Sequence, residues 1–439
     1  MSLLIRQARY VIRDAHRIER DVDLLIEGRH IRAIAPNLQA ESAPGCAPVM
    51  IDGRNHAVIP GLINAHTHLY QAFLRGRSDT LDREGWLREV IYPFRPTLHH
   101  PPAAAAIGYS AGRLAGLEML KNGTTSFIDM QASPPEAWRA WEELGIRGAV
   151  ALTFADEHLP PALPVALAEC QARLLDLAEA ARAAAVRTGR LGVLLAPAAP
   201  RLCSQAFLTW AADLAERLDL RVQTHAAGPP LPGEPSPLSW LAQAALLNER
   251  TSLAQCTHLS PADLDLIVDS GATVIHCPKS DMKLGQGIAP VPWLRARGAP
   301  VALANDGPAS GDLLDMFEEM RAAALLHKVR GDAETLTAQA AFVMATEHGA
   351  RAAGLNAGTL DPGRLADLAL IDLNRPHLVP DHDIVPLLVY CAHGSDVDTV
   401  IVDGQVVVAR GRPTRVDEAE VLREARATAA AWLPQPIFT

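Results

Sequence analysis

The most restrictive feature of this chain is an alternation of short apolar runs with longer segments of helical periodicity, between about residues 57 and 360. Such runs are typical of strands buried in a parallel sheet, and the longer segments supply crossover helices. Eight units of this kind predict a closed (β/α)8 barrel over residues 58–361, although an open α/β sheet fits the periodicity as well. The expected strands are HAVIPGLINAHTH, TTSFIDM, IRGAVALTF, RLGVLLAPA, LRVQTHAA, TSLAQCTHL, ATVIHCP and APVALANDG.

The two ends of the chain have a different pattern of apolar and polar residues. Residues 1–57 alternate apolar and polar side chains, as in LLIRQARYVI and DVDLLIEGRHIRAIAP, and Gly28 marks a tight turn. Residues 362–439 repeat this pattern in ADLALIDL and DTVIVDGQVVVARGRP, with a turn at Gly404. Isolated hairpins are only marginally stable in water, so we expect both ends to pair into one small composite β-sandwich.

Charge and composition narrow the classes of function. The 439 residues include 40 basic and 50 acidic ones, a formal charge of −10, which argues against nucleic acid and anionic membranes as partners. The N-terminal segment reaches Arg6 before any long apolar run, so it predicts neither a signal peptide nor a membrane span. The six cysteines lack C-x-x-C spacing, which is typical of reduced thiols. We therefore expect a cytoplasmic protein with a small-molecule substrate.

Metal-ligating side chains gather at the ends of the expected strands. His66 and His68 are two residues apart on an extended segment, so both imidazoles project to the same face and can reach one ion. In a parallel barrel the carboxyl ends of all strands meet at one mouth, where such enzymes carry their active sites. The later strands bring four more candidates to that mouth, namely His225, His258, His276 and Asp306.

Several longer motifs are similar to those of the amidohydrolase superfamily. They are PGLINAHTH (60–68), NGTT (122–125), HCPKSDMKLGQGIAPV (276–291), NDGPASGDLLDMFEEMR (305–321) and GSDV (394–397). The resemblance runs nearly end to end. It is closest to the branch that contains cytosine deaminase, the S-adenosylhomocysteine and methylthioadenosine deaminases, and the atrazine and triazine hydrolases.

This resemblance implies a TIM barrel with a composite β-sandwich and one divalent metal ion. Zinc is the expected metal, with iron or cobalt as alternatives. Members with two metals bridge them by a carboxylated lysine at the end of strand 4, and RLGVLLAPAAP contains none. It also implies a homo-oligomer, a dimer or a tetramer. The implied ligands are His66, His68, His225 and Asp306.

The expected chemistry is hydrolysis of a carbon–nitrogen or similar bond. A bound ion lowers the pKa of its water to about 7. Asp306 is then the expected base, while His276 and Gln255 orient the substrate. A lyase or isomerase that uses the metal only as a Lewis acid, and a metal-binding paralogue without hydrolytic activity, are the alternatives.

Two positions depart from the family pattern. Deaminating relatives carry a glutamate three residues after the strand 5 histidine, and here that position is Gly228. The strand 6 motif A-H-C-V-H-L reads AQCTHL, so Gln255 replaces its first histidine and His258 matches the second, for which a structural hydrogen-bonding role is expected. Because acid–base catalysis contributes about 10² to 10⁴ in rate, another group must serve or the reaction differs. Asp281 and Glu234 are candidates, and Asp306 acting alone is the third possibility.

A segment after the metal motif bears on the substrate. GWLREVIYPFR (85–95) resembles the lid of nucleoside deaminases, in which a glutamate at the position of Arg95 meets the ribose diol. A guanidinium has no acceptor, so Arg95 disfavours a nucleoside and favours a carboxylate or another anion, unless it forms a structural salt bridge. Trp86 is a candidate wall for a flat ring.

Overall fold

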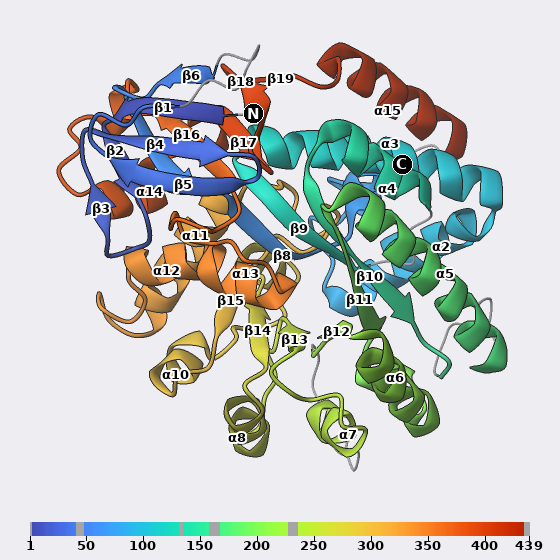
Figure 1. Cartoon of the computed structure of the whole chain (residues 1–439). Coiled ribbons are helices and arrows are strands. Elements are labelled where there is room, and N and C mark those ends of the chain that lie inside the picture. The colour runs from blue at the N-terminus through green and yellow to red at the C-terminus, as the bar shows by residue number, and fades with distance from the viewer. Residues whose placement is uncertain (1, 41–47, 131–134, 158–166, 227–235, 434–439) are drawn as a thin grey trace.

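A computed structural model describes residues 2–40, 48–130, 135–157, 167–226 and 236–433 (Figure 1). Its largest sheet has eight parallel strands that follow one another in chain order. This arrangement confirms the predicted (β/α)8 barrel. The strands are β8 (Leu62–Thr67), β9 (Thr124–Met130), β10 (Arg147–Phe154), β11 (Leu191–Pro197), β12 (Arg221–His225), β13 (Thr251–Ala254), β14 (Thr273–His276) and β15 (Val301–Leu303).

Side-chain hydrogen bonds join the last barrel strand to the first. The backbone N–H of Asn305 donates to Asn64 Oδ1 at 3.0 Å, and Thr67 Oγ1 donates to the carbonyl oxygen of Asp306 at 2.9 Å. These contacts bring the ends of β8 and β15 together, so the alternative of an open sheet is wrong.

Helices cover the outside of the barrel (Figure 1). Ser260 and Asp263 form a capping box at the start of α8, and Gly271, with a φ of +66°, ends that helix. The helices of this layer are α3 (Pro101–Lys121), α4 (Pro135–Leu144), α5 (Leu167–Thr188), α6 (Gln205–Leu218), α7 (Pro237–Gln243), α8 (Pro261–Ser270), α9 (Pro278–Lys283), α10 (Val291–Ala296), α11 (Met316–Arg330), α12 (Ala338–Ala345) and α13 (Glu347–Ala353).

Segments from both ends of the chain form the predicted composite β-sandwich. One sheet has the order β5-β4-β1-β6 and the other β19-β18-β17-β16-β7-β2-β3, so N- and C-terminal strands share the second sheet. The strands are β1 (Ser2–Ala8), β2 (Tyr10–Ile12), β3 (Ile18–Glu19), β4 (Val22–Glu27), β5 (His30–Ala35), β6 (Val49–Asp52), β7 (His56–Pro60), β16 (Leu368–Asp372), β17 (Val397–Val402), β18 (Gln405–Ala409) and β19 (Arg412–Pro413).

The expected strand HAVIPGLINAHTH is divided between two sheets. Its first half is β7 of the sandwich and its second half is β8 of the barrel, with Gly61 between them. A Cβ at Gly61 would lie 2.0 Å from Thr125 Oγ1, so only glycine allows the chain to cross here beside β9.

Four further α-helices in the described part of the chain lie outside the barrel repeats. Two of them, α1 (Arg83–Trp86) and α2 (Tyr92–His99), follow β8, and α14 (Ile384–Cys391) follows β16. The last, α15 (Glu418–Trp432), docks on α3 through ion pairs of Glu418 with Lys121 and of Glu424 with Arg113. The C-terminal segment therefore adds a helix to the barrel side as well as strands to the sandwich.

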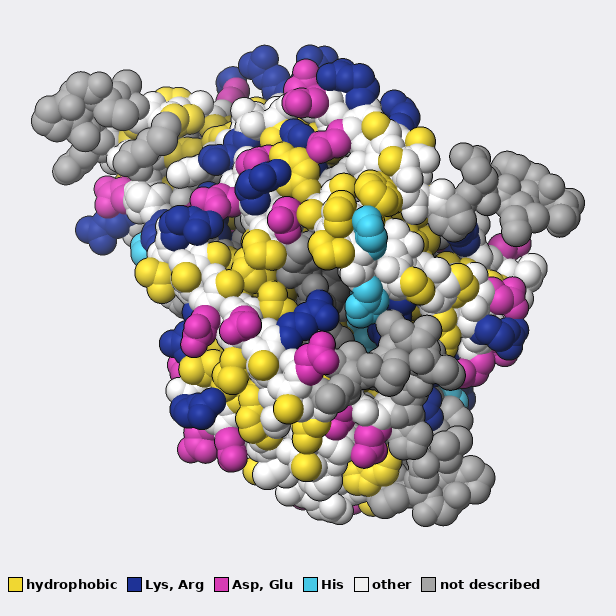
Figure 2. Space-filling view, turned by 90° about the vertical axis from the view of Figure 1, so that its right-hand side faces the viewer, with side chains coloured by type: hydrophobic (Ala, Val, Ile, Leu, Met, Phe, Trp, Pro, Cys, Tyr) yellow, Lys and Arg dark blue, Asp and Glu magenta, His cyan; other side chains and the backbone are white. Residues whose placement is uncertain are grey.

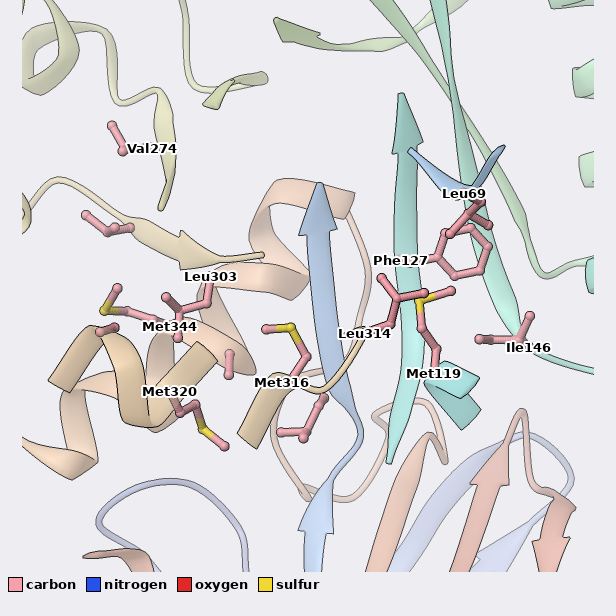
Figure 3. Close-up of a cluster of buried hydrophobic side chains, with 14 of the residues drawn as sticks. Leu69, Met119, Phe127, Ile146, Val274, Leu303, Leu314, Met316, Met320 and Met344 are labelled. Carbon is pink, nitrogen blue, oxygen red and sulfur yellow. The ribbon is translucent and has the colours of Figure 1, made fainter. Parts of the chain in front are cut away.

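The barrel strands separate two apolar layers. Val274 and Leu303 face the helices, where they join Met119, Phe127 and other side chains in the core of Figure 3. Ile275 and Ala302, one residue along, fill the barrel interior. This alternation decides which strand residues reach the mouth of the barrel.

In the described part of the chain, no helix has both the length and the apolar character that a membrane crossing requires.

Candidate metal and active site

Four of the predicted ligands converge at the mouth of the barrel. His66 and His68 lie at the end of β8, His225 ends β12 and Asp306 follows β15, and one ligand atom from each lies within 4.8 Å of all the others. His68 Nε2 is 3.2 Å from His225 Nε2. Asp306 Oδ1 is 3.5 Å from His66 Nε2 and 3.6 Å from His68 Nε2. Residues more than 200 positions apart in the chain are thus brought to one point.

All three imidazoles are oriented in the same way. Each Nδ1 faces a carbonyl oxygen, which can only accept, so each Nδ1 carries the proton and each Nε2 keeps its lone pair. The three Nε2 atoms point towards one another, and His66 Nε2 has no hydrogen-bond partner among the described residues. The partners of Nδ1 are Gln223 Oε1 for His66 at 2.8 Å, Met130 O for His68 at 2.7 Å and Ala198 O for His225 at 2.6 Å.

The electrostatics of the group favour a bound cation. Burial, His66 and, more weakly, the charge of Arg95 lower the pKa of His68 to about 4. Burial and the other two histidines lower the pKa of His225 well below its ordinary value. Burial raises the pKa of Asp306, but the proximity of His66 and of the other two imidazoles outweighs that effect and holds the pKa below its ordinary range. Neutral imidazoles beside a carboxylate are the donor set that a divalent transition metal prefers.

Hydrogen bonds hold the carboxylate of Asp306 in place. Its backbone has a left-handed φ of +58°, which a non-glycine residue adopts only when its surroundings hold it there. Because both carboxylate oxygens are engaged, the side chain is fixed before any ligand binds. The donors are the backbone N–H of Gly307 to Oδ1 at 2.8 Å, and Ser280 Oγ at 2.7 Å, Gln255 Nε2 at 3.2 Å and Ser310 Oγ at 3.3 Å to Oδ2.

His276 is not part of this group. It follows Ile275, which faces the barrel interior, and its ring lies on the other side of the strand, against the helices. Its Nε2 is 3.3 Å from His327 Nε2 on α11, and its Nδ1 is 3.8 Å from Asp281 Oδ2. Burial and His327 lower the pKa of His276 to about 3, so its imidazole is neutral. A direct role for His276 in catalysis stays a prediction. In the structure its ring lies on the helix side of β14, away from the four clustered ligands.

Asp281 lies with His276 in this buried region. Its side chain is fully buried, and neither carboxylate oxygen has a hydrogen-bond partner among the described residues. Burial and the charges of Asp306 and Glu319 raise the pKa of Asp281 well above its ordinary value. Ser280, the preceding residue on α9, donates a hydrogen bond to Asp306 Oδ2. A contact of Asp281 with substrate stays a prediction.

The two predicted lid residues lie close to the site but in different surroundings. Arg95, on α2, is half-buried and has no ion-pair partner in the described part of the chain, so the alternative of a structural salt bridge is not seen there. Trp86 is buried in an apolar cluster with Tyr70, Phe94 and Leu284. Tyr70 links this cluster to the ligands, since its ring is 6.4 Å from that of His68. Figure 2 shows histidine and basic side chains around a hollow on this side of the molecule.

The remaining sequence candidates lie outside the group or outside the described residues. His258 is exposed and is not one of the four clustered side chains. Gly228 and Glu234 fall in 227–235, which lie outside the described residues. Gln223, which orients His66, was missed by the sequence analysis. It stands two residues before His225, so strand alternation places both side chains on one face, and that spacing was the available signal.

Known proteins are similar to this chain in both sequence and fold. Residues 57–407 match the model of the Amidohydrolase family. The chain is 38% identical to a 5-methylthioadenosine/S-adenosylhomocysteine deaminase of Desulforudis audaxviator, over 98% of each chain. It is 36% identical to a 5'-deoxyadenosine deaminase of Methanothermobacter thermautotrophicus, over 95% of this chain and 96% of that protein.

Solved structures also have a fold similar to that of this chain. An adenosine deaminase from Xanthomonas campestris with bound zinc superposes with a TM-score of 0.88 at 29% identity, over 98% of both chains. A zinc-bound atrazine chlorohydrolase from Arthrobacter aurescens has the same TM-score at 24% identity, over 97% of this chain and all of that one, and so supports the fold. Together with the clustered histidines and aspartate, these matches show that the chain is a metal-dependent hydrolase of the amidohydrolase family.

Proposed function

We propose that this protein is a mononuclear zinc hydrolase that cleaves a carbon–nitrogen bond of a small nitrogen heterocycle or cyclic amide, either releasing an amine or ammonia or opening the ring. The observation that carries the proposal is the convergence of three Nε2 atoms and one carboxylate, with every Nδ1 already committed to a carbonyl oxygen. Zinc is proposed because neutral imidazole and carboxylate suit it and because two structures of similar fold are described with it.

The chain's own residues have distinct roles in this proposal. His66, His68, His225 and Asp306 hold the ion, which when bound supplies an activated water at neutral pH. Asp306, ionised at neutral pH, takes up a proton from that water and returns it to the departing nitrogen. The hydroxyls of Ser280 and Ser310, which donate to Oδ2, keep the carboxylate oriented.

The proposed substrate is smaller than a nucleoside and carries a negative charge. The relatives named above are deaminases of adenosine derivatives, yet Arg95 stands where a ribose diol would need an acceptor. A half-buried guanidinium without a carboxylate partner among the described residues favours a substrate that brings its own anion. We also propose a cytoplasmic homo-oligomer, a dimer or a tetramer, as the working form.

Metal analysis and product analysis test this function. Purified protein is expected to contain about one zinc per chain and to hydrolyse a carbon–nitrogen bond in members of a panel of hydantoins, ureas, triazines, pterins and aminopyrimidines. Labelled solvent oxygen is expected in the product. Turnover without solvent oxygen would support the lyase or isomerase instead, and full metal occupancy without any turnover would support the non-hydrolytic paralogue.

A pair of histidine variants provides the control. His225→Ala removes one ligand, so zinc content and hydrolysis are both expected to fall to background. His258→Ala changes an exposed histidine outside the cluster, so it is expected to keep about one zinc per chain. Equal zinc content in the two variants would contradict the proposed ligand set.

A further inference from the structure

The side-chain amide of Gln255 has a fixed orientation. Its Nε2 donates to Asp306 Oδ2 at 3.2 Å. A flipped amide would place Oε1 against that carboxylate, oxygen against oxygen, so only one orientation is compatible with Asp306. The carbonyl oxygen of Gln255 is therefore turned away from Asp306 and can act only as an acceptor.

This acceptor is buried and has no partner. Gln255 is 5% exposed, and its Oε1 has no hydrogen-bond partner among the described residues. Its backbone is in the left-handed region, with a φ of +71°, so the chain reverses here at the end of β13 and carries the side chain to the metal ligands. A buried carbonyl oxygen without a partner costs free energy unless a ligand or water supplies an N–H or O–H.

A second buried acceptor lies beside Gly307, the residue that follows Asp306. Gln71 is 2% exposed, and its Oε1 also has no partner among the described residues. It packs against Gly307, where a Cβ would stand only 1.8 Å from Oε1. Gly307 is the residue that donates its N–H to Asp306 Oδ1, so Gln71 contacts one hydrogen-bond donor of this carboxylate and Gln255 supplies another.

We propose that Gln255, assisted by Gln71, selects substrates that present N–H donors beside the reacting carbon. This inference rests on the proposed hydrolase function and narrows it to one class of substrate, amino- or lactam-type rings. The imidazole of the relatives' motif can donate or accept, whereas the free carbonyl oxygen of Gln255 can only accept. A ring with a bare nitrogen or oxygen at this position would face an acceptor with an acceptor and would be rejected.

Matched ligand pairs that differ in one N–H test this selection. The pairs are hydantoin with oxazolidinedione, and an aminotriazine with the methyltriazine of the same shape. Calorimetric binding to the zinc-loaded protein is measured in parallel with hydrolysis. The wild type is expected to prefer the N–H member of at least one pair by roughly tenfold or more. Gln255→Met, which keeps the length of the side chain, is expected to reduce that ratio to near one, and Gln71→Met to reduce it partly.

Ser310→Ala is the matched control. It also removes a donor to Asp306 Oδ2 but leaves the carbonyl oxygens of Gln255 and Gln71 in place, so the ratio within each pair is expected to stay at the wild-type value even if rates change. Zinc content and thermal unfolding of each variant verify that it is folded and loaded. No preference for N–H in any pair, or an unchanged preference in Gln255→Met, would overturn the proposal. A binding preference without any hydrolysis would instead refute the hydrolase function and leave the role of Gln255 standing.

Discussion

The three histidines at the metal centre differ in what holds them. His68 and His225 bond to backbone carbonyls of neighbouring strands, which move only if the barrel moves. His66 bonds to the side chain of Gln223, whose Nε2 is in turn fixed by the backbone carbonyl of Ala65 at 2.9 Å. The orientation of His66 therefore depends on one replaceable side chain.

Gln223→Leu tests this dependence. Leucine has a similar volume but no acceptor, so His66 Nδ1 loses its partner and both the tautomer and the ring angle become free. We expect zinc affinity to fall by roughly 10- to 100-fold while the protein still folds. Competition with a chelator of known affinity measures the change. Gln205→Leu, at an exposed position on α6, is the control, and equal zinc affinities in the two variants would refute the role of Gln223.

Helix α11 carries a buried acid against the outside of the barrel. Glu319 is fully buried, where it accepts from Asn305 Nδ2 at 3.2 Å and from the backbone N–H of Lys279 at 3.4 Å. Burial raises the pKa of Glu319 from 4.5 to about 8, in spite of the nearby charge of Lys279. At neutral pH this side chain is thus largely protonated in the folded protein.

A pH dependence of stability follows from this raised pKa. The unfolded chain releases the proton of Glu319 above about pH 4.5 and the folded chain only near pH 8, so ionisation of the unfolded state lowers stability between these values. Relative to Glu319→Gln, the wild type should lose on the order of a few kcal/mol between pH 5 and pH 8. Urea unfolding across this range measures it. Glu318→Gln, whose side chain is partly exposed, should give a curve parallel to the wild type; a parallel curve for Glu319→Gln would disprove the assignment.

The barrel and the sandwich are joined by a buried ionic network. Arg147, at the start of β10, bonds to Asp367 at 2.6 Å and to Asp403 at 3.0 Å, and Arg29 also bonds to Asp403. Arg147 and Asp367 are 5% and 2% exposed. Nearby, a Cβ at Gly404 would lie 2.0 Å from the carbonyl oxygen of Gly28, so the two predicted hairpin turns pack against each other. These contacts make the sandwich part of one folded body.

Arg147→Ala should therefore destabilise the whole protein. It leaves Asp367 buried without its counter-charge, and we expect a loss of about 3–5 kcal/mol in the free energy of unfolding, measured in urea. Arg187→Ala breaks an ion pair with Glu142 in which the side chains are 64% and 39% exposed, and it should cost less than about 1 kcal/mol. Losses of similar size in both variants would contradict the role of the network.

Much of this architecture could be read from the amino acids, because burial along a strand or a helix follows the spacing of apolar side chains. The eight barrel strands, the strands of the sandwich and the pairing of His66 with His68 all follow from patterns within short segments. The ends of the strands are different, because irregular backbone breaks the alternation there. The register of β8 shifts between Asn64 and Thr67, and Gln255 turns through a left-handed conformation.

Tertiary contacts therefore determine which side chains enter the mouth of the barrel and which buried atoms have no hydrogen-bond partner among the described residues. His276 turns towards His327 and the helices, although its position in the chain resembles that of His225. Gln223 reaches His66, and Gln255 reaches Asp306, across distances in the chain that no local pattern records. Local spacing sets which face of an element is apolar, but the partner of each buried polar atom is set by segments that meet only when the barrel closes.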